Sequence, residues 1–161
     1  MSFDVLTTMV LLWLAVRLAL GRGNWPLLGL AAGLGLETKY TLAVVLAVLL
    51  AGFGVFRRDV LRSAGFPTAV GIAFVLVVPN LLWQAGHDWV SVRWFLNPPP
   101  STTDETRPVF VLDVLLFTGL VPLPIAVAGV VRLVRDRALR PLGWTVVGVV
   151  AAYFVLGGKS Y

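Results

Sequence analysis

Apolar runs long enough to cross a bilayer recur along this chain, and they constrain its fold more than any other feature. A helix needs about 20 apolar residues to span the hydrocarbon core, and fewer where neighbours cover its end. Such helices are predicted at roughly 3–20, 25–37, 41–56, 66–84, 108–131 and 141–157. The chain is 58% hydrophobic with a mean hydropathy of +0.90, outside the range of soluble domains. The sequence therefore predicts an all-α, polytopic integral membrane protein with about six transmembrane helices.

The second run is too short to cross a bilayer alone, and its composition indicates how it packs. Gly29, Gly33 and Gly35 recur along it, and small residues let a neighbouring helix approach closely. The first run begins within "MSFDVLTTMV" and has no basic region before it, so we interpret it as a spanning helix rather than a signal peptide. With no cysteine and no internal repeat, residues 1–161 are expected to form a single transmembrane helical domain.

Basic residues mark alternate connections between the predicted helices. Nine of the thirteen basic residues fall there, namely Arg17, Arg22, Arg57, Arg58, Arg62, Arg132, Arg135, Arg137 and Arg140. Because cytoplasmic loops collect arginine and lysine, these connections are predicted to face the cytoplasm. Lys39, Lys159 and the one histidine, His87, then lie on the exoplasmic side. The arginines form short clusters without interleaved aromatic residues, so the net charge of +5 indicates membrane topology and not nucleic-acid binding.

The stretch "GLGLETKYT" places two charges between apolar runs. A lysine near membrane depth is unfavourable by a few kcal/mol unless it pairs, snorkels or faces water. Two interpretations remain open. Glu37 and Lys39 could lie in a tight interfacial turn with Tyr40 as an aromatic anchor. Alternatively, Lys39 could present its ammonium group to a phosphate at the level of the lipid headgroups.

A second polar cluster lies in "PNLLWQAGHDWVSVRWF". Asn80, Gln84 and His87 recur at helical spacing, so a helix that continued past the bilayer would place them on one face, where they could hydrogen-bond a sugar or a phosphate. The tryptophans of this stretch could instead form an interfacial belt. A lone histidine is more often structural than catalytic, but the neighbouring amides favour a wet cavity.

The remaining candidates lie at the two ends of the chain. Lys159 and Tyr161 belong to the terminal "GGKSY", where a snorkelling lysine is the simpler explanation. Asp4 precedes the first helix and could merely complement its dipole. No cofactor is evident, and one histidine with scattered carboxylates has no metal-ligand spacing, although Asp4 could join ligands from elsewhere around a divalent cation. Neither a nucleophile elbow nor a phosphate-binding glycine loop is present.

Taken together and in order, four stretches resemble the membrane glycosyltransferases of the protein O-mannosyltransferase type, glycosyltransferase family 39, which also includes the lipid A aminoarabinose transferases. These stretches are "FDVL" leading into a helix, "GLGLETKYT", "PNLLWQAGHDW" and the terminal "GGKSY", which is similar to the family's "GGKPYY". The matching stretches run from one end of the chain to the other.

The resemblance implies a multi-spanning GT-C fold in the cell membrane, with an active site facing the periplasm or cell exterior. It also implies a polyprenyl-phosphate sugar as donor and a protein, lipid or glycan as acceptor. A carboxylate would activate the acceptor hydroxyl, and cationic side chains would stabilise the leaving phosphate. Carried over to this chain, the substrate-binding candidates are Asp4, Lys39, Tyr40, Asn80, Gln84, His87, Lys159 and Tyr161. We expect the two lysines and the histidine to converge in one hydrated pocket.

The family's catalytic acidic motif lies upstream of the region that matches "FDVL", so we assign no catalytic residue. Asp104 and Glu105 form an acidic pair in a different loop and do not take that role. We therefore expect the chain to be an internal fragment of a longer enzyme. The fragment itself is expected to lack the catalytic carboxylate. Two alternatives remain: a transporter or flippase subunit that moves a polar or lipid-linked solute without bond chemistry, and a structural membrane subunit.

Overall fold

The computed structural model describes residues 2–39, 41–96 and 122–155. Within these ranges all regular elements are helices, which confirms the all-helical class for the described part of the chain. They are α1 (Ser2–Ala19), α2 (Trp25–Thr38), α3 (Leu42–Phe56), α4 (Arg58–Leu61), α5 (Gly65–Ala85), α6 (Val90–Leu96), α8 (Pro122–Arg135) and α9 (Arg140–Val155).

Most predicted helices have nearly the observed bounds, because hydropathy and glycine positions are local signals. α1, α2, α3, α5 and α9 each begin and end within two residues of a predicted helix. The prediction at 108–131 falls partly outside the described residues, and α8 covers its remainder and extends to Arg135. The sequence did not predict the short helices α4 and α6.

One helix of the described ranges, α5, is by itself long and apolar enough to cross a membrane. The helical stretches Val5–Ala19, Leu42–Phe56 and Arg140–Val155 are apolar but shorter. The structure thus supports one of the six predicted spans, and the other five stay predictions. Phe74, Val75 and Leu82 of α5 are 61%, 69% and 68% exposed. Contact with lipid would account for such exposed apolar side chains.

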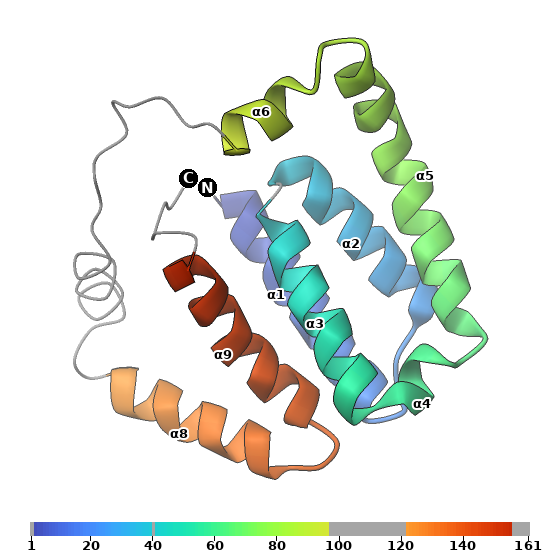
Figure 1. Ribbon diagram of the computed structural model, residues 1–161. Helices are drawn as coiled ribbons and strands as arrows, with labels where there is room; N and C mark the ends of the chain where they lie inside the picture. The colour runs from blue at the N-terminus through green and yellow to red at the C-terminus, as the bar shows by residue number, and fades with distance from the viewer. Residues whose placement is uncertain (1, 40, 97–121, 156–161) are drawn as a thin grey trace.

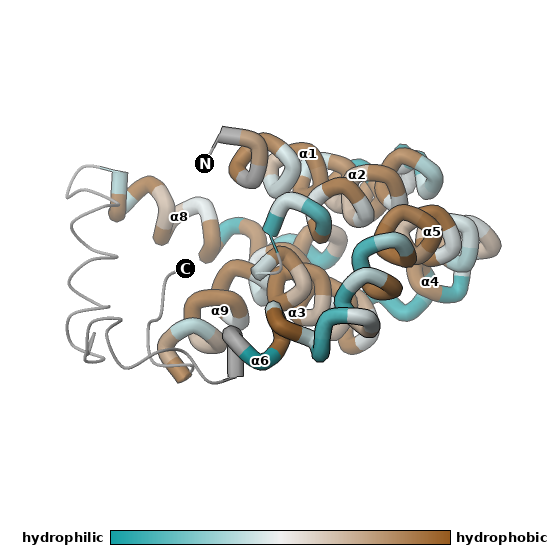
Figure 2. Tube along the Cα trace, turned by 90° about the horizontal axis from the view of Figure 1, so that it is seen from above, coloured by the Kyte–Doolittle hydropathy of each residue, from teal (hydrophilic) through white to brown (hydrophobic). Residues whose placement is uncertain are grey.

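The helices form a bundle in which α2 lies between α1 and α5, while α9 packs against α3 and α8 lies beyond α9 (Figure 1). Apolar residues run along α1, α3, α5 and α9, whereas hydrophilic residues gather towards the helix ends and connections (Figure 2). The core is apolar, with Leu11 and Ala15 of α1 completely buried.

Small residues bring the helices of this bundle into close contact. A Cβ atom added to Gly29 would lie 2.4 Å from the carbonyl oxygen of Ala69 on α5, and one added to Gly33 would lie 3.2 Å from the Cα atom of Ala73. A Cβ at Gly52 of α3 would similarly lie 2.9 Å from the carbonyl oxygen of Pro141 on α9. Gly29 and Gly33 therefore admit a neighbouring helix, as their spacing predicted.

The predicted arginine clusters gather at one end of the bundle, which we call the arginine end and define by the α1–α2, α3–α4–α5 and α8–α9 connections (Figure 1). The α2–α3 and α5–α6 turns lie at the opposite end. At the arginine end, arginine side chains cap helices, since the last carbonyl groups of a helix lack partners within it. Arg57 Nη1 donates to Ala19 O over 3.2 Å, and Arg58 Nε donates to Gly54 O over 2.8 Å.

Arg57 also forms a forked ion pair with Asp59. Its Nε and Nη2 atoms donate to the two carboxylate oxygens over 3.0 and 2.9 Å. Hydrogen bonding from the guanidinium lowers the pKa of the Asp59 carboxyl and raises the pKa of Arg57. One side chain thus ties α1, α3 and α4 together at the arginine end.

Candidate functional site

The charged turn between α2 and α3 lies opposite the arginine end. α2 stops because Lys39 adopts an extended backbone conformation (φ −159°, ψ 120°), while its N–H still donates to Gly35 O over 3.1 Å. The hydroxyl of Thr38 donates to the same carbonyl over 2.8 Å. Leu42 N then donates to Lys39 O over 3.0 Å as the next helix begins. The backbone therefore places Lys39 at the apex of a tight turn.

Lys39 lines a pocket of about 390 Å³ that α1, the α2–α3 turn, α3 and α9 form together. Five of its lining residues carry hydroxyl groups, namely Thr7, Thr8, Thr38, Thr41 and Tyr153. The apolar part of the wall consists of Val5, Met9, Leu12, Leu42 and Val45, with Gly35 beside them. Among these lining residues only Lys39 carries a formal charge. The pocket thus combines one cation, several hydroxyls and an apolar wall.

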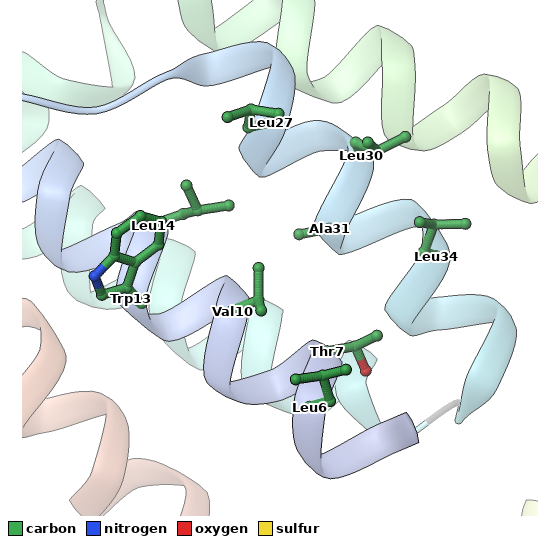
Figure 3. Close-up of a pocket in the computed structure, with 9 residues that line it drawn as sticks. All are labelled: Leu6, Thr7, Val10, Trp13, Leu14, Leu27, Leu30, Ala31 and Leu34. Atoms are coloured by element: carbon green, nitrogen blue, oxygen red, sulfur yellow. The ribbon is translucent and has the colours of Figure 1, made fainter. Parts of the chain in front are cut away.

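Two other hollows of the described bundle have a different chemistry. A groove of about 260 Å³ separates α1 from α2, and its side chains are hydrocarbon except for the Thr7 hydroxyl and the Trp13 indole nitrogen (Figure 3). The Thr7 hydroxyl donates to Phe3 O over 2.9 Å, within its own helix. A third hollow of about 290 Å³ between α2, α3 and α5 is lined by apolar residues. Both suit acyl chains or further helices and offer nothing to a charged group.

Glu37, two residues before Lys39, faces a different neighbour. Asn80 Nδ2 on α5 donates to Glu37 Oε2 over 3.3 Å, and Gln84 Nε2 donates to Asn80 Oδ1 over 3.4 Å. Gln84 Oε1 in turn accepts a hydrogen bond from Ser91 N over 3.2 Å at the start of α6. We call these four residues the amide network. It links the end of α2 to the end of α5 and to α6.

His87 lies in the turn between α5 and α6, because α5 ends at Ala85. The continuous helix that would place His87 beside Asn80 and Gln84 is therefore not formed. The imidazole stacks on Trp83 with ring centroids 4.2 Å apart, and its Nδ1 lies 2.8 Å from Trp83 O. A carbonyl oxygen can only accept, so Nδ1 carries the proton. In the neutral imidazole Nε2 is then an acceptor.

The described candidate residues thus fall into two groups. Lys39 lines the pocket, whereas Asn80 and Gln84 belong to the amide network and His87 contacts Trp83. Asp4 lies within α1, which begins at Ser2, and not before the first helix as the sequence suggested. Its side chain lies outside the described part of the chain, as do Tyr40, Lys159 and Tyr161. Convergence of both lysines with His87 therefore stays a prediction. In the described ranges no three carboxylate or imidazole side chains gather as a metal site would need.

Sequence reasoning missed the hydroxyl groups around Lys39 and the partner of Glu37. Thr7, Thr8 and Tyr153 are ordinary residues of apolar helices, and nothing in their spacing separates them from lipid-facing neighbours. The pair Thr38 and Thr41 flanks Lys39 in sequence, so it offered the one local signal. Helix packing alone brings α1 and α9 to this turn.

An apolar helical bundle whose described charged residues lie towards its two ends defines a membrane-associated helical protein. A family model described as dolichyl-phosphate-mannose-protein mannosyltransferase matches residues 2–83, just over half of the chain. The chain belongs to this family of membrane-embedded glycosyltransferases. Lys39 and Asn80 lie inside the matched segment, and Gln84 and His87 lie just beyond it. Searches of curated proteins and of solved structures found no match.

Proposed function

We propose that this chain is part of a multi-pass glycosyltransferase that transfers a sugar from a polyprenyl-phosphate donor to an acceptor on the exoplasmic face of the membrane. The observation that carries the proposal is the pocket at Lys39, where one ammonium group, several hydroxyls and an apolar wall meet. Membership of a mannosyltransferase family supports glycosyl transfer as the chemistry.

The pocket matches the chemistry of a lipid-linked phosphate. A phosphate diester needs a cation and hydrogen-bond donors for its oxygens, and an ammonium group offers a compact charge with three donors. The hydroxyls of Thr41 and Tyr153 can add neutral donors, whereas those of Thr7 and Thr38 donate to backbone carbonyls. The isoprenoid chain needs an apolar surface, and Met9, Leu12 and Val45 supply one in the same pocket. In this proposal the donor phosphate resides at the depth of Lys39.

The position of the arginines supports the orientation of this pocket. The arginine end carries the connections that positive-inside asymmetry assigns to the cytoplasm, and Lys39 lies at the other end of the bundle (Figure 1). The pocket would therefore open on the exoplasmic side. Candidates whose side chains the structure does not describe, Asp4, Tyr40, Lys159 and Tyr161, are proposed to approach the donor from that side.

Transfer would proceed by displacement at the anomeric carbon. The acceptor oxygen forms a bond to this carbon, the bond from carbon to the phosphate oxygen breaks, and the phosphate leaves with the electron pair. The acceptor proton passes to a carboxylate base, to which we assign no residue of this chain. Lys39 offsets the negative charge that develops on the leaving phosphate.

Replacement of Lys39 tests the proposal in the intact protein reconstituted in lipid. Lys39→Ala should weaken donor affinity by about tenfold to a hundredfold, because a charged hydrogen bond contributes roughly 1.5–3 kcal/mol. Lys39→Arg should retain most of the affinity, and Arg22→Ala, which removes an exposed charge at the arginine end, should leave it unchanged. Unchanged donor affinity and sugar transfer in Lys39→Ala would remove Lys39 from the site. Movement of a labelled donor across the membrane without transfer to any acceptor would favour a flippase.

A further inference from the structure

Gln84 is the most unusual buried side chain of the described bundle. It is 2% exposed although it carries a polar amide, and burial of an amide is unfavourable unless its hydrogen bonds are satisfied. The amide network meets this requirement, since Gln84 Nε2 donates to Asn80 and Oε1 accepts from Ser91 N. The backbone carbonyl of Gln84 also accepts from His87 N and Trp89 N, over 3.0 and 2.9 Å. One residue therefore anchors the whole α5–α6 turn from both its side chain and its backbone.

The anchored turn has a strained backbone. Asp88 and Trp89 have positive φ angles of 56° and 54°, which residues other than glycine seldom adopt. Such conformations persist only where the surrounding structure holds them, and they concentrate at functional sites. Here the bonds to Gln84 hold them. The turn is thus pre-organised, with the imidazole of His87 stacked on Trp83.

Glu37 connects this turn to the end of α2. Its carboxylate accepts from Asn80 on one side of the α2 end, while Lys39 lines the pocket on the side of α1 and α9. The two charged residues belong to the same tight turn but face different neighbours. The amide network therefore joins the α5–α6 turn to the end of α2 and leaves the lining of the Lys39 pocket to other residues.

We propose that Gln84 and Glu37 are positioning residues that hold the α5–α6 turn, with His87, in a fixed position at the same end of the bundle as the pocket of Lys39 (Figure 1). This inference rests on the proposed function and goes beyond it. The α5–α6 turn would align the reactants, whereas Lys39 would bind the donor. Loss of the network should lower kcat, since small misplacements of reacting groups can slow a reaction by about a hundredfold. The KM for the donor should change little.

The experiment compares matched variants of the intact protein in lipid nanodiscs. Glu37→Ala and Gln84→Leu should raise the exchange rate of the Ser91 amide about tenfold or more, because its acceptor is lost or displaced. They should lower kcat by about tenfold or more and alter the donor KM less than about twofold. Glu37→Gln keeps an oxygen acceptor for Asn80 and should restore values close to wild type. If Glu37→Ala does not fold, Asn80→Ala interrupts the same network and carries the same expectations.

Lys39→Ala separates this inference from the proposed function. If it leaves the donor KM unchanged, the proposed donor site is wrong, whatever the network variants do. If Lys39→Ala raises the donor KM while Glu37→Ala or Asn80→Ala leaves both kcat and Ser91 exchange at wild-type values, the positioning role is overturned. A fall in thermal stability with unchanged kcat would also overturn it, because the network would then be merely structural.

Discussion

Asn80 donates a hydrogen bond to Glu37 over 3.3 Å, although 43 positions separate the two residues in the chain. The bond joins α5 to the last turn of α2, where Gly29 and Gly33 have already brought these helices together. This bond and the pocket explain why an acidic and a basic residue, Glu37 and Lys39, occur within one short turn of an apolar chain. Glu37 serves the contact with α5, and Lys39 serves the pocket towards α1 and α9.

A carboxylate in place of Asn80 should reveal this contact. Asn80→Asp sets two carboxylates against each other at neutral pH, and like charges in contact disfavour the charged forms. A loss of about 1 kcal/mol would lower Tm by roughly 2–4 °C in a chain of this size. The loss should diminish in acid, as protonation removes the repulsion. Thermal unfolding at pH 7 and pH 4 measures this, with Asn80→Ala as the uncharged comparison. An equal loss at both pH values would contradict the contact.

The close contact of α2 with α5 predicts different responses from two helical glycines. Gly29→Ala places a Cβ atom 2.4 Å from Ala69 O, whereas a Cβ at Gly71 meets nothing within 4 Å. Gly29→Ala should therefore destabilise the protein by about 1–3 kcal/mol, the range for overpacked cores. Gly71→Ala should be neutral or stabilise by up to about 1 kcal/mol, since alanine favours helix. Thermal or denaturant unfolding of both variants measures this, and equal stabilities would show that the contact is absent.

The Arg57–Asp59 pair should make stability depend on pH. The hydrogen bond from Arg57 lowers the pKa of Asp59 below its ordinary value of 3.8. A carboxyl group whose pKa falls on folding stabilises the fold above its unfolded pKa, and that contribution is lost as pH falls through the folded pKa. Asp59→Asn should therefore lower Tm at pH 7, and its effect should vanish once the pH has fallen well below the folded pKa, where both states are protonated. High salt should weaken the effect at pH 7, because Asp59 is exposed.

The pocket of Lys39 and the apolar groove of Figure 3 should respond differently to added bulk. Met9 lines the pocket and Leu30 lines the groove, and both side chains are largely exposed. Met9→Trp should obstruct the apolar wall and raise the donor KM several-fold. Leu30→Trp adds similar bulk on the lipid-facing side and should leave KM unchanged. Steady-state kinetics with a polyprenyl-phosphate sugar measures the donor KM of both variants. A larger rise in KM for Leu30→Trp than for Met9→Trp would indicate that the donor binds in the groove.

Sequence reasoning located the helices well because hydropathy and glycine spacing are local signals. It placed Gly29 and Gly33 correctly at a helix contact, and the Arg57 and Arg132 clusters at the same end of the bundle. It predicted a helix that ends at residue 84, and α5 does stop at Ala85, so the continuation that would place His87 on the face of Asn80 and Gln84 is not formed. The positive φ angles in the turn that follows α5 belong to Asp88 and Trp89, so no glycine marks these positions in the sequence.

The amino-acid sequence by itself determined a helical, apolar chain whose charges are confined to the ends of its helices, because the cost of burying charge in hydrocarbon acts on each segment separately. Only the tertiary structure decided which partner each charge meets. Glu37 and Lys39 are two positions apart, yet the first contacts α5 and the second lines a pocket with α1 and α9. That division depends on the distances at which helices pack, and small residues on several different helices set those distances together.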